Sequence, residues 1–538
     1  MQVLGHHHLA QGRALRGLRA LALAWAWTAV LLAPRALAAE APRKLQVNEY
    51  RVEGAEQLTT GELEVVLAPF LGPGRELADI ESARAAVEKA YSDRGFQTVT
   101  VAIPRQTVRD GVVVLKVTEG RVGRLRVNGA RWYSPRDIKL QAQSVAEGTV
   151  PNFEALVSDI VVLNGLPDRR VTPAVRSGAL PGTVDVDLNV QDAPPLHGSL
   201  EWNNRHGAST TAQRLNGALR YDNLWQLGHS LNFAFQVAPQ LVADGKVFSA
   251  SYLARIPDVP WLTFSANGVL QDSDVSTLGA VDVKGRGRTL GGRANFTLPG
   301  TTRFFQSIST GLDCKRYEEA LSLGAETMRT PIEHWPWTTR YGVAWAGDAS
   351  QTQLGLSAAF NVRALSSSAD QFDSRRYKAS AGFMVFRLDF SRTDELPLGL
   401  QLFERVQAQF SPDPLISSEQ ITAGGAESVR GYLEAQASGD YGGVGTIELR
   451  GPSFAARLRP AVDDWRLFVF ADGGRLGLRY PLPEQTPLYR LVSAGGGMRI
   501  GLFRKLDASL DVGVPLASGG VTTKFREPRV HFRLSSEF

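Results

Sequence analysis

The chain has 538 residues, a formal net charge of +5 and a single cysteine, Cys314. This length permits either several domains or one very large domain. The lone cysteine excludes an intrachain disulfide framework. The lysines and arginines form no compact basic patch of the kind that nucleic acids bind, so we expect no nucleic-acid partner.

Residues 1–38 have the order of a secretory signal peptide. Arginines precede an apolar run over residues 20–33, and a small-residue triplet that ends at Ala38 follows it. The apolar run is shorter than the roughly 20 residues that a transmembrane helix needs. We therefore expect cleavage after Ala38 and export of the mature chain, which is close to neutral once the arginines of the leader are removed.

A duplicated module follows the leader. The stretches VEGAEQLTTGEL (Val52 to Leu63) and VNGARWYSPRDI (Val127 to Ile138) align without a gap, and their apolar, hydroxyl and acidic positions recur in the same order. Such self-similarity at an offset of about 75 residues indicates a repeated structural unit. We predict one copy over residues 39–119 and a second over 120–194.

The first copy predicts a β-α-α-β-β order. A β-rich strand precedes a short helix over residues 60–68, and two further β-rich strands follow a second helix. Asp79 is the expected N-cap of the second helix, and Gly95 suits the C′ position just beyond its end.

From residue 195 onward the helical periodicity disappears. Apolar and polar residues alternate over 231–237 and again over 506–514. One apolar and one polar face per strand fits either a sandwich or a membrane barrel. The length of this region, the leader and the aromatic last residue, Phe538, favour a transmembrane antiparallel β-barrel of about 16 strands over residues 195–538. Phe538 resembles the signal that the outer-membrane barrel assembly machinery reads.

One long glycine-rich segment interrupts the predicted strands, over residues of about 411–443. It contains ITAGGAESVRGYLEAQASGDYGG, whose centre is Val429, Arg430, Gly431 and Tyr432. A loop of this length is usually functional or disordered.

The strand WRLFVFADGG supplies a partner for this loop. Its alternation turns Phe468, Phe470 and Asp472 toward the lumen of the barrel, and Gly474 follows on the same face. Asp472 would gain from a cation inside the barrel, and the loop carries one in Arg430. We predict that the loop folds inward and that Arg430 pairs with Asp472 as a latch.

These features together resemble the two-partner secretion transporters of the TpsB type, which include hemolysin and adhesin secretion proteins. The resemblance rests on VRGY, on FADGG (Phe470 to Gly474) and on EQ, GG, GD and EL, which occur in the order of that family (Glu419-Gln420, Gly424-Gly425, Gly439-Asp440 and Glu448-Leu449).

The resemblance implies an outer-membrane protein of a Gram-negative bacterium. Its two modules would be periplasmic polypeptide-transport-associated (POTRA) domains that capture an unfolded exported partner, a hemolysin- or adhesin-like exoprotein of the TpsA type. Its barrel would contact outer-membrane lipid and would meet the barrel assembly machinery during biogenesis. The resemblance also implies that the loop folds into the pore.

The alternatives are an insertase of the same superfamily, which folds other barrels into the membrane, and a passive diffusion porin. A porin would not need the duplicated modules, and insertases commonly carry more than two of them. No G-x-S-x-G, H-E-x-x-H or phosphate-binding-loop motif is present in the sequence. We therefore expect no catalytic residues, no cofactor and no metal.

Overall fold

The computed structural model describes residues 44–538 apart from 209, 258, 279–280, 324–325, 456–460 and 519–522. The predicted signal peptide lies outside the described residues. The chain forms two compact units, Met1–Gly120 and Arg121–Phe538. Among the described helices, none is long and apolar enough to cross a membrane.

The first unit is a small mixed module. Its central sheet has the order β2-β5-β4, and β2 and β5 run parallel. Helix α2 turns one apolar face toward the core. The elements are β1 (Leu45–Val47), β2 (Glu49–Glu53), α1 (Thr60–Leu67), β3 (Gly72–Arg75), α2 (Leu77–Asp93), β4 (Val99–Ala102) and β5 (Val112–Glu119).

The N-cap prediction for α2 was wrong by three residues. The cap is Glu76, and Asp79 occupies the N3 position, where its carboxylate accepts the Glu76 backbone N–H at 2.9 Å. An acidic residue at N3 closes a capping box and is as typical of a helix start as an N-cap residue, which explains the error. Gly95 has a left-handed φ of +88° just beyond the helix, as expected of a C′ residue.

The second module repeats this arrangement inside the second unit. Its sheet has the order β6-β8-β7, and its first and last strands, β6 and β8, are again parallel. The shared topology agrees with the internal sequence repeat. The elements are β6 (Arg121–Asn128), α3 (Pro135–Gln141), α4 (Phe153–Leu163), β7 (Arg169–Ser177) and β8 (Thr183–Asp192).

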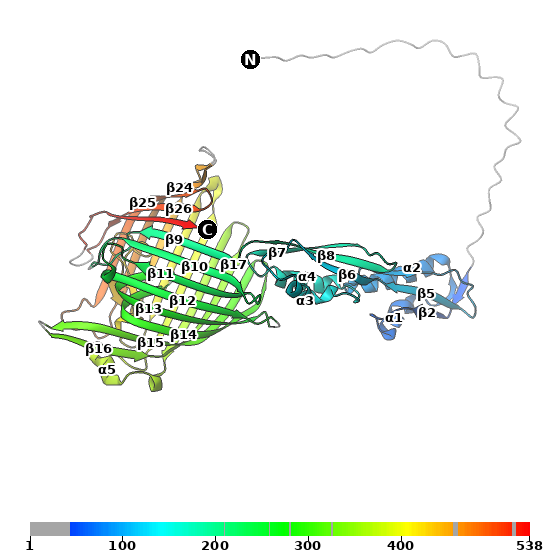
Figure 1. Ribbon diagram of the computed structural model, residues 1–538, viewed down its shortest axis with the longest axis horizontal. Coiled ribbons are helices and arrows are strands. Elements are labelled where there is room, and N and C mark those ends of the chain that lie inside the picture. Colours follow the sequence, from blue (N-terminus) through cyan, green and yellow to red (C-terminus); the bar gives the residue numbers. More distant parts are fainter. Residues whose placement is uncertain are drawn as a thin grey trace, which may run out of the picture. The chain divides into compact units, whose positions relative to one another are not determined.

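The rest of the second unit is a closed antiparallel barrel, which confirms the predicted fold class. Figure 1 shows its strands side by side in chain order, with the red C-terminal strand next to β9. Two segments, β16 and β17, both pair with β15 and are the halves of one strand interrupted at Trp335. The barrel therefore has 16 strands.

The barrel strands are β9 (Leu196–Asn203), β10 (Arg214–Leu224), β11 (His229–Val237), β12 (Gly245–Arg255), β13 (Leu262–Leu278), β14 (Val281–Thr301), β15 (Phe304–Leu323), β16 (Glu326–His334), β17 (Pro336–Ala346), β18 (Ser350–Asn361), β19 (Met384–Glu395), β20 (Gln401–Phe410), β23 (Tyr441–Arg450), β24 (Val462–Gly477), β25 (Leu488–Leu502), β26 (Leu506–Pro515) and β27 (Arg529–Glu537). Helix α5 (Ala369–Arg375) lies between β18 and β19.

Alternation along the strands separates an apolar outer face from an inner one. Leu467 and Val469 on β24 are exposed on the outside, whereas Phe468, Phe470 and Asp472, at the alternate positions of the same strand, are buried. Because successive side chains of a strand point to opposite faces, the buried set lies on the inner wall.

The long loop connects β20 to β23 and is slightly shorter than predicted, because β23 already begins at Tyr441. We call residues 411–440 the loop. It is not irregular throughout, since β21 (Ile421–Ala423) and β22 (Ala437–Gly439) pair as a two-stranded sheet. The Gly424-Gly425 pair follows β21 with left-handed φ values of +109° and +104°, a conformation that other residues rarely adopt.

Candidate functional site

Arg430, at the tip of the loop, forms a two-pronged ion pair with Asp472 on the inner wall. Its Nε and Nη2 donate to the two carboxylate oxygens at 3.0 and 2.9 Å, and its backbone N–H donates to the same carboxylate at 3.0 Å. The two side chains are 5% and 0% exposed. Parallel N–H···O bonds of this kind fix orientation as well as distance.

Neighbouring strands complete the site around this pair. Arg430 Nη1 donates to Glu448 on β23 at 2.7 Å and to Asp511 on β26 at 3.4 Å. The Arg430 carbonyl oxygen lies 2.8 Å from His531 Nε2 on β27. We call Arg430 with Asp472, Glu448 and Asp511 the tip site. Its carboxylates lie on β23, β24 and β26, which belong to one run of neighbouring strands in the barrel.

Glu448 is shared among three arginines. Arg450 and Arg499 reach its other oxygen at 2.7 and 2.8 Å while Arg430 holds the first. Three guanidinium groups thus face three carboxylates, those of Glu448, Asp472 and Asp511. This balance lets Arg430, Glu448 and Asp472 remain buried, because each one is paired and hydrogen-bonded.

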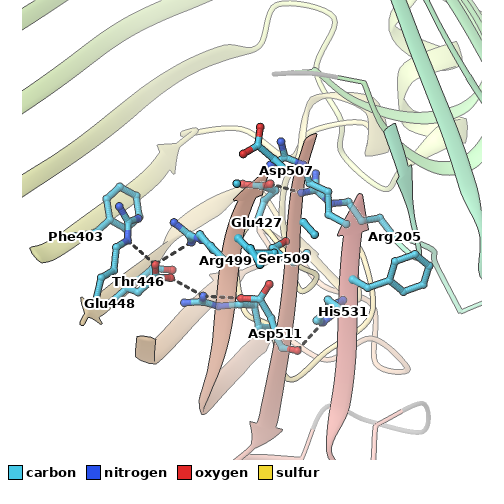
Figure 2. Close-up of a pocket in the computed structure, with 18 of the residues that line it drawn as sticks. Arg205, Phe403, Glu427, Thr446, Glu448, Arg499, Asp507, Ser509, Asp511 and His531 are labelled. Atoms are coloured by element: carbon cyan, nitrogen blue, oxygen red, sulfur yellow. Dashed lines mark hydrogen bonds and ion pairs between the residues drawn. The ribbon is translucent and has the colours of Figure 1, made fainter. Parts of the chain in front are cut away.

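The cluster borders a cavity of about 480 Å³. Figure 2 shows Glu448, Arg499, Asp511 and His531 converging from neighbouring strands, together with Glu427 of the loop and Arg205, which follows β9. The groups that line the cavity are mostly charged. Such a space is suited to water or to a polar chain rather than to an apolar ligand.

The rings of Phe468 and Phe470 pack against the Arg430 guanidinium group. The guanidinium carbon lies 3.3 Å from the centroid of the Phe470 ring and 5.9 Å from that of Phe468. Gly495 and Gly497 lie opposite these residues on β25, and a Cβ added at either would come within 2.6 Å of a ring carbon. The glycine run of β25 therefore makes room for the rings.

The residues next to Arg430 pack just as closely. A Cβ on Gly431 would lie 2.8 Å from Ser493 Cβ and 2.9 Å from the Pro515 nitrogen. Tyr432 is fully buried, and its hydroxyl lies 2.7 Å from the Ala517 carbonyl oxygen. Val429 is fully buried as well, and a Cβ added at Gly474 would lie 3.4 Å from its Cγ2.

A second set of contacts holds the start of the loop. Glu419 is 1% exposed, and Lys315, His334 and Arg387 approach its carboxylate at 2.5, 3.0 and 3.2 Å. These partners lie on β15, β16 and β19, and Gln409 on β20 adds a bond to the Glu419 carbonyl oxygen at 3.0 Å.

The end of the loop is held in a similar way. Asp440 is fully buried and accepts both Nη atoms of Arg376 at 2.5 Å. The backbone N–H groups of Leu415 and Arg479 donate to the same carboxylate at 2.9 and 2.6 Å. We call Glu419 and Asp440 with their basic partners the base sites.

The structure brings the predicted loop and wall residues together. Val429, Arg430, Gly431 and Tyr432 all lie against the wall that carries Phe468, Phe470, Asp472 and Gly474. Phe538, the predicted assembly signal, lies away from this site, where the last strand of the barrel meets β9. Phe538 exchanges backbone hydrogen bonds of 2.8 and 2.9 Å with Gly198 on β9.

Sequence reasoning did not assign roles to Glu448, Asp511, His531 or the base sites. Glu419, Asp440 and Glu448 do fall within the EQ, GD and EL pairs that carried the family resemblance. The sequence did offer one signal for these residues, namely single acidic residues close to apolar strands. A charge buried inside a barrel needs a partner, so each of them indicated an ion pair.

Comparison with known protein families agrees with this architecture. Residues 182–500 match the family described as haemolysin secretion/activation protein ShlB/FhaC/HecB. Residues 45–120 match the ShlB-type POTRA domain.

Curated relatives include two kinds of outer-membrane transporter. The outer membrane transporter CdiB of Dickeya dadantii is 24% identical over 473 residues, which cover 81% of this chain and 76% of the relative. The heme/hemopexin transporter protein HuxB of Haemophilus influenzae is 20% identical over 395 residues, covering 72% and 68%.

Solved structures share the fold. CdiB from Escherichia coli superposes with a TM-score of 0.63 at 20% identity, covering 94% of this chain and 93% of that one. BamA from Haemophilus ducreyi, without its POTRA domains 1–3, gives a TM-score of 0.54 at 14% identity, covering 92% and 100%.

Proposed function

The chain belongs to the haemolysin secretion/activation protein family, and we propose that it secretes an unfolded partner protein through its barrel to the cell surface. Transporters of this two-partner type lie in the outer membrane, with their POTRA modules in the periplasm. The observation that carries the proposal is the loop, which is held inside a closed barrel by buried ion pairs. A releasable obstruction suits gated passage of a polypeptide better than passive diffusion.

The partner we propose is an exoprotein of the TpsA type, hemolysin- or adhesin-like, that reaches the periplasm unfolded. Within the described residues, β2 of the first module has a strand neighbour on one side only. An extended client offers mainly backbone hydrogen bonds, which a free strand edge can accept by β-augmentation. The first module is thus the proposed capture site.

Binding to the modules can be measured directly. We expect a soluble fragment from Ala39 to Asp192 to bind the N-terminal region of the partner by calorimetry. An unrelated unfolded polypeptide of equal length is the control. Binding by the full-length protein without any binding by the fragment would contradict this role of the modules.

A barrel assembly insertase remains the second candidate, because the BamA structure shares the fold. Deletion of the gene separates the two functions. A secretion transporter should leave other outer-membrane barrels at normal levels while its partner disappears from the surface and the medium. Loss of several unrelated barrels with normal secretion of the partner would favour the insertase.

We further propose that Phe538 is the signal read by the barrel assembly machinery. Its ring covers Gly198, where an added Cβ would meet a ring carbon at 2.3 Å, and its backbone extends the pairing of Arg533 to Glu537 with β9. We expect Phe538→Ala to lower the amount of assembled, heat-modifiable barrel severalfold, and Leu516→Ala, another exposed apolar residue, to leave it unchanged. Equal assembly of both variants would contradict the role.

A further inference from the structure

Asp168, His197 and Asp222 come together where the second module meets the barrel. Asp168 precedes β7, whereas His197 and Asp222 lie on β9 and β10. One ligand-type atom of each residue lies within 4.8 Å of the others. His197 Nε2 is 2.9 Å from Asp168 Oδ2 and 3.9 Å from Asp222 Oδ2. The three side chains therefore surround a common point, and they come from both parts of the second unit.

A fourth polar group belongs to the same region. Tyr133 is 3% exposed, and its hydroxyl has no hydrogen-bond partner among the described residues. Burial raises the pKa of Tyr133 to about 12, with Asp168 as the strongest neighbouring charge and Asp222 also contributing. Buried hydroxyls are normally satisfied by protein, water or ligand. Tyr133 lies beside the three residues, because the guanidinium carbon of Arg169, next in the chain to Asp168, is 5.1 Å from its ring centroid, and the side chain of Asn223, next to Asp222, reaches the Trp132 carbonyl oxygen. The unpartnered hydroxyl of Tyr133 thus points to a bound group.

We propose that Asp168, His197 and Asp222 bind one Zn²⁺ ion. Two carboxylate oxygens and one imidazole nitrogen supply three ligands of a tetrahedral site, and a water in the fourth position would give the Tyr133 hydroxyl its partner. The imidazole favours zinc over calcium or magnesium, which prefer oxygen ligands alone.

Neighbouring cations compete for one of these ligands. Arg220 Nε lies 2.7 Å from Asp222 Oδ2, and Arg255 is close enough to feel the charge of the same carboxylate. The Arg220 side chain is 48% exposed, so it can turn into solvent when a metal ion takes its place. Once Arg220 has turned away, the two carboxylates outnumber the remaining cation, Arg255, whose guanidinium donates to the Gly228 carbonyl oxygen, and the site is attractive to a divalent cation.

A metal ion bound at this site would link the second module to the barrel. Asp168 belongs to the second module, and the other two ligands belong to the first hairpin of the barrel. The metal would replace the hydrogen bond between Asp168 and His197 with a bond to each of these side chains, and would hold the module against the first hairpin of the barrel. This proposal does not depend on which polypeptide the barrel transports.

The test uses full-length protein in detergent, purified with a histidine-free tag and stripped with a chelator. Titration with Zn²⁺ alone should show one equivalent bound. His197→Ala should weaken binding more than the 10–100-fold typical of losing an outer-shell partner, and Tyr133→Phe by about 10-fold. His206→Ala is the matched control, because the His206 ring bonds to the nearby Asn204 carbonyl oxygen and lies beyond the opposite end of β9 from His197, so its loss should leave binding intact.

Asp168→Asn provides a milder variant, and heat-modifiability confirms that each barrel is folded. The proposal is overturned if the wild type binds no stoichiometric Zn²⁺, if folded His197→Ala or Asp168→Asn binds as well as the wild type, or if His206→Ala is equally impaired. Equal competition by Ca²⁺ would also overturn it, because the imidazole would then not be a ligand.

Discussion

The tip site and the base sites hold the same loop with opposite polarity. At the tip, the loop supplies a cation, Arg430, and the barrel wall supplies the carboxylates of Asp472, Glu448 and Asp511. At the base, the loop supplies the carboxylates of Glu419 and Asp440, and the surrounding elements supply the basic groups. A loop shifted along the wall would therefore bring like charges together, so the reversal specifies one docked position.

The sites also differ in how the backbone restrains them. Asp440 directly precedes β23, so its partners stay within reach even when a contact is lost. Glu419 is slightly nearer to the end of β20 than Arg430 is to the start of β23, and Arg430 lies closest to the middle of the excursion. Because local concentration falls as the connecting chain lengthens, the tip depends more strongly on its own contacts.

Removal of the tip cation should have the largest effect. Truncating one partner of a buried ion pair costs about 3–5 kcal/mol, because the other charge is left unpaired. We expect Arg430→Ala to abolish most secretion while the barrel still assembles, measured by partner in the medium and by heat-modifiability. Arg405→Ala is the control, since its pair with Glu427 is 33% and 50% exposed and such pairs contribute only about 0–1 kcal/mol.

A double mutant tests whether the two charges act as one unit. Asp472→Ala should resemble Arg430→Ala, and the double variant should be no worse than either single variant. Strictly additive losses would show that the contact between Arg430 and Asp472 does not matter for transport, and the tip site would then lose its proposed role.

The pairing of Arg430 with Asp472 could be predicted because both residues stand out locally. One is a single cation within a glycine-rich loop, and the other is a carboxylate in a strand whose alternation assigns it to the lumen. Alternation with period two is a local property of a strand, and it therefore also revealed the strands. The length of the region, the leader and the aromatic last residue then favoured a barrel over a sandwich.

The remaining contacts could not be read from the sequence, because they depend on strand register. Asp511 and His531 face each other across β26 and β27, and nothing in either strand alone sets that pairing. Lys315 and Glu419 are separated by more than a hundred positions and meet only after the barrel closes. The same applies to Asp168 and His197, whose contact requires the second module to lie against the first hairpin.

The space around the tip gives a graded test with one type of substitution. Gly431→Ala would place Cβ 2.8 Å from Ser493 Cβ, whereas Gly474→Ala would place it 3.2 Å from Val444 Cγ1. Overpacking typically costs about 1–3 kcal/mol, and the closer contact should lie at the upper end. We expect Gly431→Ala to reduce secretion clearly more than Gly474→Ala does. The reverse order would mean that the loop tip does not dock as described.

Neutralising the carboxylates of the base sites should have the smallest effect, although both side chains are almost completely buried. Glu419→Gln and Asp440→Asn keep the shape and one acceptor oxygen, so the loss is closer to that of individual hydrogen bonds, about 1–3 kcal/mol, than to that of a whole ion pair. The adjoining strands still hold each end of the loop near its partners. In planar bilayers these variants should therefore show brief openings, whereas Arg430→Ala should show long ones, because only the tip variant frees the middle of the loop from the lumen. Longer openings in Asp440→Asn than in Arg430→Ala would reverse the ranking, and the ends of the loop, rather than its tip, would then control the pore.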